Sequence, residues 1–479
     1  MAETRGVVPS TGARTGPGTD CPYSPGQGAG DGSVAEQHSE FTWRSVTAAW
    51  AASVGMFVGT TPMISAVASL FVIPITSEFH ISRTFYSTLM LVQPYIVALC
   101  SPFGGRLIDR YGTRRVLLPV VLAFGLAQWA MWGAGSLWQI IAVFAFTGIL
   151  GGVHTYTAYT RVISSWFARR RGVVLGFMLM MGSSLGSVLV VQLVKRLIPE
   201  YGWRAGYVGM GCVILFYGLP VMWLFLREPV RAARGESGMA SAPSAVAPNA
   251  TAVPLSPVPP ADADAAATHA PLPGMTRAEA MRTRTFWTIF IALTFAPMAI
   301  IGTIGQSVPM LQSRGFPLDV ASNAVSSVYI GAMLAQTCSG FLLDRFDSPR
   351  IALPFFAAAF IGVLIMHTSQ SASTLLPGAV LMGMGQGTEM GIGAYLISRF
   401  FGMRHFASIY SFIFAASNLG LGLGIISMGT VYDRWHSYAP MKYVMPTALV
   451  LAMLLFLSLG PYRFAKETAV SDADRRGRR

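Results

Sequence analysis

The stretch Gly104-Gly-Arg-Leu-Ile-Asp-Arg-Tyr-Gly-Thr-Arg-Arg115 joins two long apolar runs, and it decides the fold. A related stretch follows 235 residues later as Gly340-Phe-Leu-Leu-Asp-Arg345. The same shift also places Arg115 on Arg350 and aligns glycines of the apolar runs. One offset that aligns both loops and apolar runs predicts a chain built from two similar halves, as in some transporter folds.

The composition indicates a membrane protein. Of the 479 residues, 53% are hydrophobic and 11% are charged, whereas a soluble globular protein carries about 25% charged residues. The net charge of +13 is expected on loops that face an anionic lipid leaflet, and we expect no nucleic-acid partner. The four cysteines form neither a disulfide framework nor a metal motif. The sequence also contains no nucleophile–base set or cofactor loop, so we expect neither an enzyme nor a cofactor.

The apolar runs predict an all-α polytopic membrane protein with 12 transmembrane helices, arranged as two pseudo-symmetric six-helix halves. The first six spans are expected at about 46–75, 84–103, 116–134, 138–163, 173–197 and 206–226. The second six are expected at about 286–313, 320–343, 351–369, 373–398, 408–431 and 441–462. The expected domains are a disordered tail (1–44), a first half (45–226), a Pro/Ala-rich linker (227–285), a second half (286–462) and a tail (463–479).

The distribution of basic residues predicts the orientation. With both termini in the cytoplasm, the inside segments hold 26 of the 34 Lys and Arg residues and the outside loops hold 7. Short cytoplasmic loops carry such an excess in membrane proteins. We therefore expect a multi-pass protein of the plasma (inner) membrane whose tails and linker are cytoplasmic.

The Gly104–Arg115 stretch resembles the signature loop of the major facilitator superfamily, Gly-x-Leu-x-Asp-Arg-x-Gly-x-Arg-Arg. The matching residues are Gly105, Leu107, Asp109, Arg110, Gly112, Arg114 and Arg115. In that family the charged groups of the loop form a cytoplasmic relay that holds the outward-facing state, so the resemblance implies a conformational latch. The second copy keeps Asp344 and Arg345 but departs from the pattern further on, which implies a weaker latch. The alternative is that these charges only anchor a loop at the interface.

Two further stretches resemble the monocarboxylate-porter-like and oxalate/formate-antiporter-like bacterial members of this superfamily. Ser165–Gly176 is similar to their Trp-Phe-x-x-Arg-Arg-Gly-x-x-x-Gly element, and Gly383–Tyr410 is similar to their tenth span and the loop after it. The resemblance implies a small organic anion as substrate. Those porters commonly use a cation in spans one, eight or eleven, but this sequence has no Lys or Arg inside those spans, apart from Arg345 just past the eighth. The substrate-binding cation of the family therefore cannot be assigned here.

Glu389 is the one acidic residue that the expected spans place well inside the membrane, roughly 13 Å above the inner end of span ten. A carboxyl group at that depth is costly unless it is paired or protonated, so function is the first hypothesis. The 235-residue shift places it opposite His154 in span four. These two titratable groups on equivalent helices form a candidate proton-coupling pair. The alternative is that each is satisfied by a neighbouring polar group and serves packing.

Arg161 carries the guanidinium group that we expect inside a span, two turns below His154. Such a cation in a cavity binds a substrate carboxylate in bidentate fashion. Two alternatives stay open: the side chain extends to the inner interface, or it pairs with Glu389.

Other polar and aromatic side chains at membrane depth are candidate substrate contacts. Each is equally able to hydrogen-bond to a neighbouring helix. These candidates are Gln93, Tyr95, Tyr156, Tyr159, Gln306, Tyr329, Tyr395 and Asn418.

Together these features predict a secondary active transporter that moves a small organic anion, a mono- or dicarboxylate, by alternating access. Protons are expected to couple through Glu389 and His154, and Arg161 to attract the carboxylate. Efflux of amphipathic or cationic compounds, with Glu389 as the counter-charge, is the alternative within transport. A membrane sensor that binds a solute without moving it is the alternative of another class. The expected partners are thus a small-molecule substrate, protons and the lipid bilayer.

Overall fold

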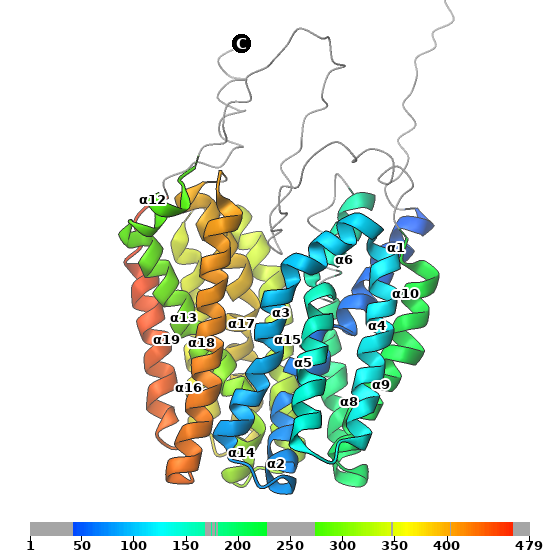
Figure 1. Cartoon of the computed structure of the whole chain (residues 1–479). Helices are drawn as coiled ribbons and strands as arrows, with labels where there is room; N and C mark the ends of the chain where they lie inside the picture. Colours follow the sequence, from blue (N-terminus) through cyan, green and yellow to red (C-terminus); the bar gives the residue numbers. More distant parts are fainter. Residues whose placement is uncertain are drawn as a thin grey trace, which may run out of the picture. The chain divides into compact units, whose positions relative to one another are not determined.

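The computed structural model describes residues 42–167, 174, 178, 181–227, 274–345, 348–402 and 404–462. All of them belong to one structural unit, Glu40–Arg479. This part of the chain is built from helices, and its one β element is an isolated bridge between Gly274 and Gly402. The all-α architecture expected from the sequence is confirmed, and Figure 1 shows the helices packed along a common direction.

The helices of the first half follow the apolar runs of the sequence. They are α1 (Trp43–Phe57), α2 (Ala68–Glu78), α3 (Arg83–Tyr111), α4 (Thr113–Ala130), α5 (Leu137–Val153), α6 (Tyr156–Trp166), α8 (Gly186–Tyr201), α9 (Trp203–Cys212) and α10 (Leu219–Phe225). A π-helical turn with Pro62 near its start separates α1 from α2, and the pair is bent by 43°. The bend lies between Ser65 and Ala68, directly after the π-helical turn, and a π-helical turn is a common cause of a helix kink.

The second half follows the same order of elements. Its helices are α12 (Arg277–Met281), α13 (Arg284–Gly305), α14 (Ser307–Ser313), α15 (Leu318–Arg345), α16 (Ala352–Thr368), α17 (Ala372–Phe401), α18 (Phe406–Trp435) and α19 (Met441–Leu457). Among the described residues, seven helices are long and apolar enough to cross a membrane, and the bent α1–α2 pair makes an eighth. Two more apolar helices, α16 and α19, have 17 residues each, which is the lower limit for a span.

Close helix packing at glycines repeats between the halves. A Cβ atom at Gly152 on α5 would lie 2.5 Å from the Cβ of Cys100 on α3. A Cβ atom at Gly387 on α17 would lie 2.3 Å from the carbonyl oxygen of Ala332 on α15. These two glycines are related by the 235-residue shift. Because small residues let helix backbones approach closely, both halves pack the corresponding helix pairs in the same way.

The bundle has two ends, which we name by the residues they carry. The motif end holds the Gly104–Arg115 stretch, between α3 and α4. The opposite end holds the start of α3 and the last turn of α18. In Figure 1, α2 and α14, which contact each other, mark the opposite end.

Candidate functional site

The Glu389 carboxyl group is buried among three helices of the second half. Glu389 lies on α17, is 4% exposed, and forms a hydrogen bond with the side chain of Ser417 on α18. A cavity of about 10 Å³ lies beside it, which is room for one water molecule. The residues that line this cavity are Leu293, Glu389, Gly393, Tyr410, Ile413, Phe414 and Ser417. An acid placed this way can take up and release a proton within the membrane.

Three aromatic rings on α18 lead to this cavity. The rings of Phe406 and Tyr410 are stacked with centroids 5.7 Å apart, and those of Tyr410 and Phe414 are stacked at 6.2 Å. Their spacing of four residues places them on one face of the helix. We call Phe406, Tyr410 and Phe414 the aromatic ladder.

His154 interrupts the fourth predicted span. The span expected at 138–163 is confirmed as one apolar segment, Leu137–Ile163, that is long enough to cross a membrane. Within it α5 and α6 are separated by His154 and an extended Thr155. The His154 Nε2 atom lies 3.1 Å from the carbonyl oxygen of Gly55 on α1. Because a carbonyl only accepts, Nε2 carries a hydrogen and Nδ1 is the acceptor of the neutral ring. The imidazole also packs edge-on against the rings of Phe124 and Tyr159, at 5.9 and 5.5 Å.

Several buried polar atoms of the first half lack a hydrogen-bond partner among the described residues, and three of them belong to candidate site residues. They are Nδ1 of His154, the hydroxyl oxygen of Tyr159 and Nε2 of Gln93. Buried polar atoms are usually paired, so these three are candidates for binding a proton, water or substrate. His154 contacts helices of its own half, as Glu389 does, so the expected proton-coupling pair is not in direct contact in this conformation.

Arg161 lies at the motif end, in an ion pair with Asp109 of the signature loop. The side chains of Arg161 and Asp109 are 43% and 63% exposed. The prediction that α3 ends near residue 103 is wrong, because the helix continues to Tyr111 and brings Asp109 to α6. The pair with Glu389 considered from the sequence is therefore replaced by a pair with Asp109. A contact of Arg161 with substrate stays a prediction.

The other residues of the signature loop occupy different environments. Arg114 donates from Nη2 to the Trp223 carbonyl oxygen on α10, at 2.6 Å. Arg110 lies over the ring of Tyr111, at 5.4 Å from its centroid, and Arg115 is exposed. A Cβ atom at Gly105 would meet nothing within 4 Å. The latch stays a prediction.

In the second copy of the motif, the backbone of Asp344 and Arg345 ends α15, and their side chains lie outside the described part of the structure.

Four more candidate contacts lie inside their own halves. Asn418 donates from Nδ2 to a carbonyl oxygen of its own helix, at 2.9 Å. The Tyr395 ring packs edge-on against that of Tyr462 at 5.9 Å. Tyr156 packs against the hydrophobic core, and Tyr329 is 4% exposed. Contacts of these residues with substrate stay predictions.

Asp433, near the end of α18, caps the first turn of α3 across the two halves. Its Oδ1 accepts from the N–H of Arg83 at 3.0 Å, and its Oδ2 accepts from the N–H of Thr84 at 2.8 Å. A carboxylate at a helix N-terminus satisfies free N–H groups and is stabilised by the helix dipole. The opposite end of α3 is therefore held by the second half.

A chain of side-chain contacts continues from this cap. The guanidinium carbon of Arg83 lies 3.4 Å from the centroid of the Tyr432 ring, and Nη1 donates to the Tyr438 hydroxyl at 2.6 Å. Tyr438 donates to Oε1 of Gln306 at 3.0 Å, and Nε2 of Gln306 donates to Ser87 on α3 at 2.9 Å. Gln306 thus links the two halves, and its contact with substrate stays a prediction. We call Asp433, Arg83, Tyr438, Gln306 and Ser87 the seal.

A second group of polar contacts joins α8 to α15 at the same end. Lys195 Nζ donates to Asp319 at 2.5 Å and to Asn323 at 3.1 Å. Gln192 donates from Nε2 to Asn323 at 3.0 Å and to Ser326 at 2.8 Å. Two separate helix pairs thus close the opposite end.

At the motif end the same face of α3 is uncovered. Ser87, Leu91 and Tyr95 on α3 lie against glycines of α18. The row continues every four residues to Leu99 and Phe103, which are 72% and 67% exposed. The two halves therefore meet at the opposite end and part toward the motif end.

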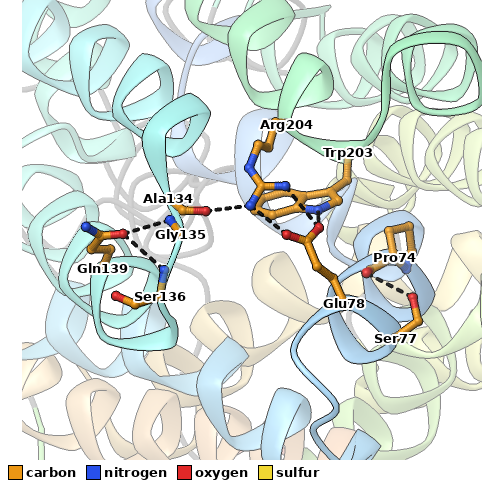
Figure 2. A network of polar contacts seen from close by, with 9 residues as sticks. All are labelled: Pro74, Ser77, Glu78, Ala134, Gly135, Ser136, Gln139, Trp203 and Arg204. Carbon is orange, nitrogen blue, oxygen red and sulfur yellow. Dashed lines mark hydrogen bonds and ion pairs between the residues drawn. The ribbon is translucent and has the colours of Figure 1, made fainter.

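The first half is fastened internally at the opposite end (Figure 2). The Glu78 carboxylate at the end of α2 accepts from Nε1 of Trp203 at 2.5 Å and from Arg204 at 2.6 and 2.9 Å. Arg204 also donates to the Ala134 carbonyl oxygen at 2.6 Å. These bonds tie α2, α9 and the α4–α5 connection together within the first half.

Comparison with known proteins identifies the family. The sequence model of the Major Facilitator Superfamily matches residues 48–321 and 287–476. The chain is 23% identical to the gallate transporter of Pseudomonas putida over 364 residues, which is 73% of this chain and 80% of that protein. It is also 23% identical to the 4-hydroxybenzoate transporter PcaK of Pseudomonas aeruginosa, over 80% of this chain and 86% of that protein.

The fold matches a solved structure. That structure is a bacterial homologue of the human lysosomal transporter Spinster, in an inward-facing and unoccupied conformation. The TM-score is 0.59 at 14% sequence identity, over 88% of this chain and 96% of the other. With the family match over most of the sequence, the chain belongs to the Major Facilitator Superfamily and is a multi-pass membrane transporter.

Proposed function

We propose that this transporter moves a small organic anion together with protons across the plasma membrane. The observation that carries the proposal is the Glu389 site, where a 4% exposed carboxyl group bonds to Ser417 beside a water-sized cavity. Acidic groups at membrane depth mark proton and substrate pathways. A protonated Glu389 donates a hydrogen bond to a substrate carboxylate, whereas the ionised form repels it. Proton and anion therefore bind together, which is the requirement for symport.

The substrate class that we propose is an aromatic carboxylic acid. Two relatives are named for gallate and for 4-hydroxybenzoate, which supports this choice. Tyr410 and Phe414 of the aromatic ladder line the cavity beside Glu389. In the conformation described here the cavity has room for one water molecule, so the substrate enters only when the helices around Glu389 move apart. Its planar ring then stacks favourably on these aromatic side chains, while its carboxylate meets the Glu389 proton.

The transport cycle follows from the contacts between the halves. In the proposed orientation the motif end is cytoplasmic, so the conformation described here is open to the cytoplasm and closed outside. Opening the outer side requires the seal to break and the motif end to close. Gly105, which now has open space around it, then packs against the second half, and the Asp109–Arg161 pair rearranges as part of the latch. His154, with a free Nδ1 acceptor, is the second proton site of this proposal.

Replacement of Glu389 tests the proposal. In proteoliposomes with an acidic exterior, Glu389→Gln should lose accumulation of labelled 4-hydroxybenzoate but keep exchange against internal substrate, because exchange needs no net proton movement. The matched control is Glu279→Gln, which removes an exposed acid on α12 and should accumulate substrate normally. Normal accumulation by Glu389→Gln would remove Glu389 from the coupling mechanism.

Efflux of amphipathic cations is the competing function, because a carboxylate beside aromatic rings also suits a cation. The same proteoliposomes distinguish the two. If tetraphenylphosphonium binds the wild type, fails to bind Glu389→Gln, and no carboxylate binds either protein, Glu389 is a counter-charge for cations and the anion proposal is wrong.

A further inference from the structure

An apolar groove lies on the outer surface of the first half, between α4 and α10. Its volume is about 490 Å³. Its lining residues are Leu118, Pro119, Leu122, Leu219, Pro220 and Trp223. Leu122 is 43% exposed and Trp223 is 59% exposed. In Figure 1, α4 and α10 lie at the edge of the bundle away from α13 and α18, so the groove opens toward lipid rather than toward the second half.

The groove lies close to the motif end. Leu118 and Leu122 are five and nine residues from the start of α4 at Thr113, which is about 7 to 13 Å along the helix. Trp223 is in the last turn of α10, which ends at Phe225. In a bilayer whose hydrocarbon core is about 30 Å thick, this depth lies within one leaflet, the cytoplasmic one in the proposed orientation.

Three arginines lie at the motif-end termini of the two helices that form this groove: Arg114 and Arg115 in the first turn of α4, and Arg227 two residues beyond α10. Arg114 donates from Nη2 to the carbonyl oxygen of Trp223, a lining residue, at 2.6 Å. Its neighbour Arg115 is exposed at the start of α4, and Arg227 is exposed just beyond α10. Nε1 of Trp166 donates to the Arg227 carbonyl oxygen at 2.8 Å, which fixes the chain at that point. Positive charge thus lies at one end of a wholly apolar channel.

We propose that this groove binds one anionic phospholipid, with an acyl chain along α4 and α10 and the phosphate at Arg114, Arg115 and Arg227. The molecule that fits must be apolar along the groove and anionic at the motif end, and a phospholipid has this layout. Basic groups at a membrane surface attract anionic lipid by about 1 kcal/mol each. Because Arg114 belongs to the signature loop and also contacts α10, the lipid holds the loop in its present place.

Lipid titration of the purified full chain tests this proposal. Native mass spectrometry should show one phosphatidylglycerol bound more tightly than further lipids and more tightly than phosphatidylcholine. Arg115→Gln should weaken that binding about fivefold, which corresponds to about 1 kcal/mol. Its matched control is Arg350→Gln, at the repeat-related position of the second half, which is also exposed.

The groove itself is tested by filling it. Leu122→Trp should abolish the tight phosphatidylglycerol site, whereas Leu454→Trp on α19, where the leucine is 56% exposed, should leave it intact. Inorganic phosphate should not compete, since it has no chain to occupy the groove. The proposal is overturned if phosphatidylcholine binds as tightly, if Leu122→Trp retains the site, or if phosphate displaces the lipid.

Discussion

Asp433→Asn is the substitution that probes the seal between the halves most directly. Asp433 accepts from two backbone N–H groups of α3, at 3.0 and 2.8 Å. Asparagine keeps the size and one acceptor oxygen, but it removes the charge and turns the other oxygen into a donor. One of the two bonds is therefore lost, and the other no longer involves an ionised group.

The size of the effect follows from these contacts. A hydrogen bond to a charged group contributes about 1.5–3 kcal/mol, and the charge at a helix N-terminus adds about 0.3–1 kcal/mol. Water replaces part of this when the seal opens, because the freed N–H groups are then hydrated. We expect a net change of about 1–2 kcal/mol, which shifts the ratio of sealed to open conformations about 5- to 30-fold toward opening.

Electron–electron distance measurements check this expectation. Spin labels at Glu200→Cys and Gln370→Cys, in a background without the four native cysteines, report on the opposite end, since both residues are exposed there and outside the seal. Asp433→Asn should move the distance distribution toward longer values. Asp319→Asn is the control, because its pair with Lys195 is 67% exposed on the aspartate side and such pairs contribute about 0–1 kcal/mol. An unchanged distribution for Asp433→Asn, or equal shifts for both variants, would refute the reasoning.

Three further predictions concern the motif end and the first half. Gly104→Ala should lower the melting temperature, because its Cβ would lie 2.3 Å from a carbonyl oxygen of α5. Gly105→Ala has open space around its Cβ and should melt as the wild type does, so equal losses of melting temperature in the two variants would contradict this prediction. Arg161→Gln should change the distances between the halves but not substrate affinity, because its partner is Asp109; an affinity loss of about tenfold in a binding titration would instead make Arg161 a substrate anchor. Glu78→Gln removes the ion pair with Arg204 and should destabilise the first half by only about 1 kcal/mol, because the pair is partly exposed. Thermal melting measures this loss, and an unchanged melting temperature would show that the network in Figure 2 adds no stability.

The helices were predictable from the sequence because each depends on a local apolar run. The equivalence of the two halves was predictable from the repeat, which aligns Gly152 with Gly387, and the structure places both glycines at close helix crossings. Breaks of the helix inside an apolar run were harder to predict. No proline marks the break between α5 and α6 at His154; the sequence signal there is the Gly151-Gly152 pair just before it, because glycines weaken a helix.

Side-chain partners were the part that the sequence did not provide. Arg161 was expected inside a span because span four was placed at 138–163, and its partner Asp109 was expected in the stretch after span two rather than on a helix beside it. The seal was missed because its bonds join residues far apart in the chain, such as Arg83 and Asp433, which are separated by 350 residues. One signal for the seal is present in the sequence. The outer ends of the spans carry few basic residues, such as Arg83 and Lys195, and acidic residues such as Asp433 and Asp319 lie at the same ends. Opposite charges at one end of the bundle indicate that they form pairs.

The Glu389 site has one part that the sequence predicts and one part that it does not. Its depth and its place on α17 follow from the sequence, as does its being the one acidic residue well inside an expected span. Its surroundings do not, because Ser417, Tyr410 and Phe414 come from α18. Helix packing, rather than the pattern of any one span, puts the aromatic ladder beside the acid.

The central claim is that protons and an aromatic carboxylate cross together, and proton entry measured during substrate uptake tests it most directly. Wild-type proteoliposomes loaded with a pH-sensitive dye should acidify inside when 4-hydroxybenzoate is added, beyond the rate in protein-free liposomes, and Glu389→Gln should lose this excess. Uptake of 4-hydroxybenzoate by the wild type without excess acidification, or acidification equal in both proteins, would contradict the account.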